Sequence, residues 1–247
     1  MPESSIFPKW EEVPEDAKVD RIEGRILVGG EIRSQGLARK DVLSPCLVTK
    51  GGKAPEAPVL GTTPQVTGEQ FEEAVDAAAR SWNKGRGDWC TARMEERISA
   101  VAQFRKRFAE KRELMVRLLM WEIAKTRPDA EAEIDRTLIY IDDTLEATRQ
   151  LDRDGSRMQF AGGIMAQVRR MPLGVVLCMG PFNYPINETF TTLIPALVMG
   201  NSVVAKLPRF GQLVWDPLLE AFRDCFPAGV INIVNGLGRE VNQPTVK

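Results

Sequence analysis

The spacing of hydrophobic residues between residues 67 and 150 predicts long amphipathic helices. Apolar side chains recur there every three to four positions, the period of a helix with one buried face. One helix is predicted to begin at Thr67, where Gln70 completes a capping box. A second is predicted from about Met94 to Ile123, and a third begins near Pro128. We interpret their apolar stripes as core.

After residue 158 the pattern changes to short β-branched runs separated by helical segments. Residues 158–170 predict a strand pair around Gly162 and Gly163. The segments that follow alternate as strand 173–179, helix 185–199, strand 202–206, helix 212–224 and strand 230–234. Alternation at this spacing predicts parallel strands joined by right-handed crossovers. We therefore expect an α/β fold with a doubly wound parallel sheet, preceded by strands and loops that include a hairpin turning at Gly29 and Gly30.

Polar residues and glycines stand where the predicted parallel strands end. Asn183 lies in a turn past the first strand, Lys206 ends the second, and Gly236-Leu237-Gly238 follows the third. Ligands of doubly wound sheets bind beyond these carboxyl ends. The Asn183 amide could donate to an oxygen on which negative charge develops, or it could cap the next helix. Lys206 could contact a ligand or extend its stem towards solvent, and the glycines could form a simple turn.

The composition narrows the possible functions. The 33 basic and 34 acidic residues give a net charge of -1, so neither nucleic acid nor an anionic membrane is an expected partner. We find no apolar core of a signal peptide after Met1, and no apolar run long enough to span a membrane. Four irregularly spaced cysteines favour a reduced, cytoplasmic protein. The absence of histidine excludes imidazole general bases, His-ligated zinc and a Ser-His-Asp triad within this chain.

Four motifs resemble the aldehyde dehydrogenase superfamily in order and spacing. They are Arg170-Met171-Pro172-Leu173-Gly174, Pro181-Phe182-Asn183-Tyr184-Pro185, Gly200-Asn201-Ser202-Val203-Val204-Ala205-Lys206 and Pro227-Ala228-Gly229-Val230-Ile231-Asn232. The similarity extends over residues 20–247 and is sharpest after residue 168. It implies a nicotinamide cofactor and a role for Asn183 as the oxyanion-hole amide. The cofactor contacts that it implies are Gly180, Phe182, Lys206, Pro208 and Gly238.

A narrower resemblance is to the non-phosphorylating, NADP-dependent glyceraldehyde-3-phosphate dehydrogenases. These enzymes share the tyrosine after the asparagine and a second asparagine, here Tyr184 and Asn187, and an arginine on the preceding helix, similar to Arg136. The resemblance implies that Arg136 and Tyr184 approach a small aldehyde substrate, and a guanidinium suits a phosphate. Arg136 could instead pair with a surface carboxylate. The chain departs from this family at Asn242 and Gln243, where the family has a glycine and an acidic residue.

The residue three positions after Lys206 bears on cofactor choice. NAD-preferring relatives often have a glutamate there, which binds the ribose hydroxyls and repels a 2′-phosphate. Here the residue is Arg209, whose charge is opposite. We therefore expect NADP to be favoured, with NAD still possible. The alternative is an exposed arginine without a ligand.

No cysteine of this chain fits the nucleophile of the superfamily. Cys178 lies inside an apolar strand, where a buried thiol is inert, and Cys225 precedes a turn. The chain ends at Lys247, before the region where the superfamily carries its nucleophilic cysteine and its water-activating glutamate. We therefore expect the N-terminal half of an aldehyde dehydrogenase, unable to oxidise an aldehyde by itself.

The resemblance implies three parts of the chain. Residues 1–157 form an N-terminal arm and the helical part of the cofactor-binding domain, residues 158–171 form strands that join subunits of a homo-oligomer, and residues 172–247 form a Rossmann-like cofactor-binding core. Two other functions stay open. One is a non-catalytic, truncated protein that binds nucleotide or assembles with full-length partners, and the other is a reductase of acyl phosphates or acyl-CoA within the same superfamily.

Overall fold

The predicted parallel strands lie side by side in a twisted sheet. The computed structural model describes residues 7–236 and residue 238, and over these residues the largest sheet has the order β3-β2-β10-β9-β8. Its parallel strands are β8 (Val175–Met179), β9 (Ser202–Lys206) and β10 (Ile231–Val234). The hairpin β2 (Ile26–Val28) and β3 (Glu31–Arg33) adds antiparallel to β10. The doubly wound α/β sheet and the hairpin are therefore confirmed, with the strand boundaries shifted by up to two residues.

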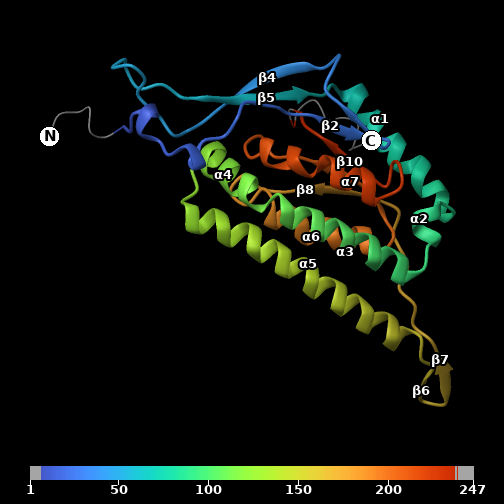
Figure 1. The fold of residues 1–247 in the computed structure, drawn as a ribbon. Coiled ribbons are helices and arrows are strands. Elements are labelled where there is room, and N and C mark those ends of the chain that lie inside the picture. The colour runs from blue at the N-terminus through green and yellow to red at the C-terminus, as the bar shows by residue number, and fades with distance from the viewer. Residues whose placement is uncertain (1–6, 237, 239–247) are drawn as a thin grey trace.

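A second sheet lies along the top of the molecule in Figure 1. It has the order β1-β5-β4 within the described residues and contains β1 (Ile22–Glu23), β4 (Ala38–Leu43) and β5 (Val59–Gln65). The residue after β5 ties the two sheets together, because the Val66 N–H donates to the Asn235 carbonyl at 3.1 Å. The carboxyl end of β5 is thus held beside the carboxyl end of β10.

Helices cover both faces of the largest sheet (Figure 1). Helix α1 (Gly68–Trp82) packs on one face, against β8, β9 and β10. The other face carries α6 (Asn187–Val198), the 3-10 helix η5 (Leu213–Leu218) and α7 (Leu219–Cys225). An outer layer packs on these and contains α3 (Met94–Glu110), α4 (Arg112–Ile123) and α5 (Arg127–Gly155). The short elements of the described chain are η2 (Trp10–Glu12), η3 (Glu15–Ala17), η4 (Asn83–Gly85) and α2 (Asp88–Thr91).

The start of α1 follows its local signal, whereas two other predicted helices differ from the structure. Both hydrogen bonds of the capping box are present, from the Gln70 N–H to Thr67 Oγ1 at 3.3 Å and from the Thr67 N–H to Gln70 Oε1 at 3.0 Å. The single helix predicted over 94–123 is wrong: the chain turns at Lys111 (φ -97°, ψ 0°), so that α3 and α4 each aim an apolar face at the core. The predicted helix 212–224 begins as a 3-10 helix that contains Pro217, whose nitrogen cannot donate to a helical hydrogen bond.

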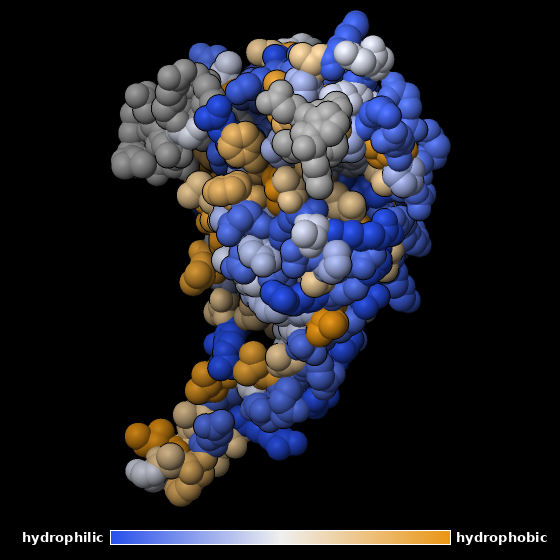
Figure 2. All heavy atoms as spheres, turned by 90° about the vertical axis from the view of Figure 1, so that its left-hand side faces the viewer, coloured by the Kyte–Doolittle hydropathy of each residue, from blue (hydrophilic) through white to orange (hydrophobic). Residues whose placement is uncertain are grey.

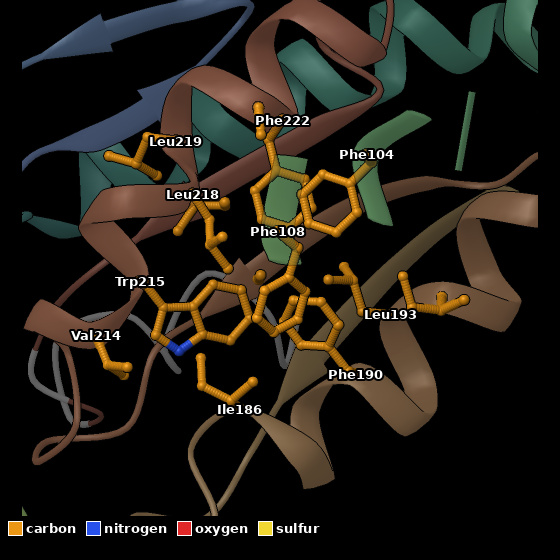
Figure 3. Close-up of a cluster of buried hydrophobic side chains, with 14 of the residues drawn as sticks. Phe104, Phe108, Ile186, Phe190, Leu193, Val214, Trp215, Leu218, Leu219 and Phe222 are labelled. Atoms are coloured by element: carbon orange, nitrogen blue, oxygen red, sulfur yellow. The ribbon is translucent and has the colours of Figure 1, made fainter. Parts of the chain in front are cut away.

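A cluster of aromatic side chains joins these layers (Figure 3). The rings of Phe104 on α3 and Phe222 on α7 stack with their centroids 4.1 Å apart. Phe190 on α6 packs on Phe108 at 5.3 Å and on Trp215 of η5 at 5.3 Å. Each such pair contributes about 0.5–1.5 kcal/mol beyond the burial of its surface. The cluster therefore fixes the helices that follow both loops at the carboxyl edge of the sheet.

The predicted strand pair after residue 158 is present and projects from the molecule. Strands β6 (Gln159–Ala161) and β7 (Ile164–Ala166) pair antiparallel beyond the end of α5, away from both sheets (Figure 1). Phe160 is 73% exposed, and Ile164 and Met165 are also exposed, so hydrophobic side chains gather on this projection (Figure 2). Among the described residues, none of the helices combines the length and the apolar character that a membrane crossing requires.

Candidate functional site

Two loops meet where β8 and β9 end. Met179 pairs with Lys206 across the parallel strands, so the loop 180–186 and the loop 207–212 leave the sheet side by side. The rings of Phe182 and Phe210, one from each loop, are 6.3 Å apart and nearly perpendicular. The structure thus places the loop that contains Asn183 beside the loop that follows Lys206, at two of the three strand ends that the sequence predicted as a site.

A buried glutamate from the outer layer holds the end of the first loop. Glu133 of α5 accepts hydrogen bonds at Oε1 from the backbone N–H groups of Ile186, at 3.0 Å, and Asn187, at 3.2 Å. The Asn187 side chain also donates to Thr137 Oγ1 at 3.3 Å, one turn further along α5. These are the N–H groups that begin α6 and that the helix itself cannot satisfy. Two positions of α5 therefore fix the end of the loop.

The same glutamate connects the loop to a lysine. Glu133 Oε2 pairs with Lys125 Nζ, and the two side chains are only 0% and 11% exposed. Lys125 Nζ also lies 3.6 Å from the ring centroid of Tyr184, in a cation–π contact. Tyr184 is therefore held by the charged pair at the base of the loop.

Asn183 is exposed at the tip of this loop. Among the described residues, its side chain makes no hydrogen bond to the protein, and α6 begins without a capping side chain from its N-cap residue, Ile186. The interpretation of Asn183 as a helix cap is therefore wrong, because Glu133 satisfies those N–H groups instead. Within residues 7–236 the Asn183 amide therefore has no protein acceptor for its N–H groups.

Gly180 and Cys178 occupy tightly packed positions beside the loop. A Cβ atom at Gly180 would lie 1.7 Å from Thr189 Oγ1, so any side chain there would collide with the first turn of α6. Cys178 is buried, and burial raises the pKa of its thiol above the ordinary value. A thiol that is both buried and harder to ionise is a poor nucleophile, in agreement with the expectation that Cys178 is inert.

The second loop is held by another buried glutamate. Glu122 of α4 accepts hydrogen bonds from the backbone N–H groups of Gln212 at 2.6 Å, Leu213 at 3.0 Å and Val214 at 3.3 Å. Burial raises the pKa of Glu122 to about 7 against the pull of these N–H groups. The Gln212 side chain donates to the Pro208 carbonyl at 2.8 Å, so that the loop is closed on itself.

One cation ends β9 and another lies on this second loop. Lys206 is half-buried, and burial lowers the pKa of its ammonium group. Arg209 is exposed, and its guanidinium lies 5.2 Å from the ring centroid of Phe210. Neither Lys206 nor Arg209 forms an ion pair with a carboxylate among residues 7–236. Gly238 is half-buried, whereas Leu237, Asn242 and Gln243 lie outside the described residues.

Arg136 is exposed on α5, three residues after Glu133. The expected carboxylate partners are engaged elsewhere: Asp135 pairs with Arg112 at 2.7 Å, and Glu133 pairs with Lys125. Within the described part of the chain no carboxylate lies within ion-pair distance of Arg136. The interpretation of Arg136 as a surface ion pair therefore has no support among the residues that the structure describes.

Sequence reasoning missed the two glutamates that fix the loops. Their signal was a carboxylate next to apolar core positions: Glu122 follows Trp121, and Glu133 precedes Ile134 on the inward face of its helix. A buried carboxylate needs hydrogen-bond donors. The burial expected at these two positions therefore predicts that each glutamate accepts hydrogen bonds from another part of the chain.

The sheet and its two loops define a class of protein, the doubly wound α/β fold with polar residues at the carboxyl edge of the sheet. The family model described as "Aldehyde dehydrogenase family" matches residues 53–247. The chain belongs to the aldehyde dehydrogenase family, as the sequence motifs predicted.

Individual relatives differ in the aldehyde on which they act. The NADP-dependent glyceraldehyde-3-phosphate dehydrogenase of Streptococcus equinus is 33% identical over 193 residues, which are 76% of this chain and 40% of that protein. The N-succinylglutamate 5-semialdehyde dehydrogenase of Chromobacterium violaceum is 31% identical over 163 residues, 66% of this chain and 33% of that protein. The chain thus spans well under half the length of these relatives.

Solved structures of aldehyde dehydrogenases have the same fold as this chain. The NADP-dependent glyceraldehyde-3-phosphate dehydrogenase of Bacillus halodurans, complexed with NADP, superposes with a TM-score of 0.73 at 29% identity, and the match covers 90% of this chain and 45% of that one. A betaine aldehyde dehydrogenase matched in the same way holds NAD⁺. Both nicotinamide cofactors therefore occur among the structures that this chain resembles.

Proposed function

We propose that this chain forms the cofactor-binding part of an NADP-dependent aldehyde dehydrogenase that oxidises glyceraldehyde 3-phosphate to the acid through a cysteine thioester. The observation that carries the proposal is the pairing of the ends of β8 and β9. Asn183, Lys206 and Arg209 therefore lie at one edge of the sheet, and within the described residues the Asn183 amide has no hydrogen-bond partner and neither cation has a carboxylate partner. NADP, when bound, supplies the acceptor for the hydride that leaves the aldehyde carbon.

The residues present fit such a cofactor. Gly180 lets the backbone pass close to α6, where a side chain would collide with Thr189. Lys206 and Arg209 offer cations at the place where a doubly wound sheet receives the ribose and its phosphate. A guanidinium can form two parallel hydrogen bonds to a phosphate, worth about 1.5–3 kcal/mol each as charge-assisted bonds. Arg209 thus supports NADP over NAD.

The residues that we assign to substrate binding lie on the first loop and on α5. Asn183 donates its amide N–H to the carbonyl oxygen as negative charge develops there. Loss of such a donor raises the activation barrier by about 3–4 kcal/mol. Tyr184 forms a wall of fixed orientation because Lys125 and Glu133 hold it. Arg136, free of a carboxylate within the described chain, attracts the phosphate of the substrate.

The thioester-forming cysteine belongs, in this proposal, to another part of the enzyme. Cys178 and Cys225 both have pKa values raised by burial, which disfavours the thiolate that attacks an aldehyde. The water-activating glutamate is assigned elsewhere as well, because Glu122 and Glu133 are buried and occupied by backbone N–H groups.

A binding titration tests the cofactor assignment. The chain is titrated with NADPH and with NADH, each followed by the fluorescence of the reduced nicotinamide, before and after Arg209→Glu. We expect NADPH to bind about ten- to a hundredfold more tightly than NADH, and the substitution to remove that preference. Lys106→Glu on the outer helix α3 makes the same change of net charge and should leave the ratio unchanged. An NADPH/NADH ratio that Arg209→Glu leaves unaltered would contradict the assignment.

A second candidate function is a subunit-interaction protein without catalysis. The observation that favours it is the projecting hairpin of β6 and β7, on which Phe160, Ile164 and Met165 are exposed. A chain that binds neither nucleotide but co-elutes with a full-length family member in size-exclusion chromatography would support this function over the first.

A further inference from the structure

A cavity of about 220 Å³ opens between the second sheet and the loop that follows β9. Its wall includes Lys40 and Asp41 of β4, Thr63 and Gln65 of β5, and Arg209 and Gly236 from the carboxyl edge of the largest sheet. The cavity therefore joins the cation already assigned to the cofactor with side chains from a different part of the chain.

Two backbone hydrogen bonds fix the two walls relative to each other. The Val66 N–H donates to the Asn235 carbonyl at 3.1 Å, and the Leu207 N–H donates to the Val234 carbonyl at 3.0 Å. The end of β5 and the loop that carries Arg209 are thus both anchored to the end of β10. Lys40 is placed by its register in the second sheet, directly opposite Thr63 of β5.

The cavity has an excess of positive charge. Lys40 and Arg209 are exposed, and within residues 7–236 neither lies within ion-pair distance of a carboxylate. The one acid in the wall, Asp41, already pairs with Arg21 at 3.8 Å. Two cations that have no carboxylate partner among the described residues thus line one cavity, and this lining favours an anion.

We propose that Lys40 is a second specificity residue for NADP, which binds the 2′-phosphate together with Arg209. The inference rests on the proposed function, because it takes the adenosine ribose to lie at the loop after β9. A 2′-phosphate carries between one and two negative charges at neutral pH. Arg209 supplies a planar fork of donors, and Lys40 supplies a compact point charge from the opposite wall. Neither cation alone neutralises a dianion.

Two nucleotides that differ only in this phosphate test the inference. Adenosine 2′,5′-bisphosphate and adenosine 5′-monophosphate are titrated into the chain by calorimetry. Lys40→Ala should weaken binding of the bisphosphate by about tenfold and leave the monophosphate unchanged. Lys40→Arg keeps the charge and should restore most of the affinity. Lys106→Ala, an exposed lysine on α3, is the matched control and should change neither constant. Lys40→Gln is a second neutral variant should the alanine disturb β4.

The outcomes separate the two proposals. If Arg209→Ala removes the preference for the bisphosphate and both neutral variants at Lys40 do not, the inference is overturned while the NADP assignment stands. If the unaltered chain binds both nucleotides equally, or neither, then both proposals fail. A selective loss in the Lys40 variants that Lys40→Arg restores supports the inference.

Discussion

Glu133→Gln should destabilise the fold far more than an ordinary change of one charge. The Glu133 side chain is fully buried and serves two partners, with Oε2 paired to Lys125 and Oε1 accepting the N–H groups of Ile186 and Asn187. Glutamine keeps the shape but replaces one acceptor oxygen with a donor. If the new NH₂ faces Lys125, two donors meet. If it faces the loop, both backbone N–H groups lose their acceptor.

The expected loss of folding stability can be worked out for either orientation of the glutamine amide. Breaking a buried ion pair by neutralising one partner costs about 3–5 kcal/mol, because a buried charge is left uncompensated. A buried N–H without an acceptor costs about 1–3 kcal/mol. Lys125 is 11% exposed, so some solvent reaches the ammonium group, and we place the loss at the lower end, about 3 kcal/mol.

Urea unfolding of the chain, followed by the fluorescence of its 5 tryptophans, measures this loss. Glu131→Gln is the matched control, since Glu131 pairs with Arg127 on the surface of the same helix at 3.1 Å and should cost less than about 1 kcal/mol. The double variant Lys125→Met with Glu133→Gln should lose less than the sum of the single losses. A Glu133→Gln loss no larger than that of Glu131→Gln would refute the reasoning.

Three further predictions concern pH, activity and association. Because the pKa of Glu122 is raised from 4.5 to about 7 on folding, the folded state binds a proton that the unfolded state has released between these values. Stability should therefore fall as the pH rises through this range, and Glu122→Gln should flatten that slope in urea midpoints measured across it. The chain should form no NADPH from glyceraldehyde 3-phosphate above background; turnover abolished by Cys178→Ser would reverse our assignment of that thiol. Light scattering at micromolar concentration should show self-association, weakened by Phe160→Ser combined with Met165→Ser, whereas a monomer would argue against the hairpin as a contact.

Much of the fold could be predicted because its signals are local. The capping box at Thr67, the β-branched runs of the parallel strands and the glycine turns all act over a few residues. The break at Lys111 gave no such signal, since no glycine or proline stands there, and the core alone decides that α3 and α4 are separate helices. Pro217 is a local signal against one regular helix over residues 212–224, and it lies in the 3-10 helix η5 that precedes α7.

The strand-end part of the site could be predicted for a different reason. Parallel strands end at one edge, so Asn183 and Lys206 had to be neighbours once the strands were recognised. The residues that hold the loops could not be found in this way. Glu133 lies 53 residues before its partner Ile186, and Glu122 lies 90 residues before Gln212. Only the packing of the outer helices brings these pairs together.

The two glutamates also take the place of capping side chains at the helices that follow the two loops. The N–H groups that begin a helix need acceptors, and usually a side chain just before the helix provides one. Here the N-cap residues Ile186 and Gln212 give no side-chain cap, and the outer helices α5 and α4 provide Glu133 and Glu122 instead. An asparagine that capped its own helix through its side-chain oxygen would have the orientation of its amide fixed by that helix. Because Glu133 and Glu122 do the capping, no side chain of the loops 180–186 and 207–212 is needed to cap the helix that follows it.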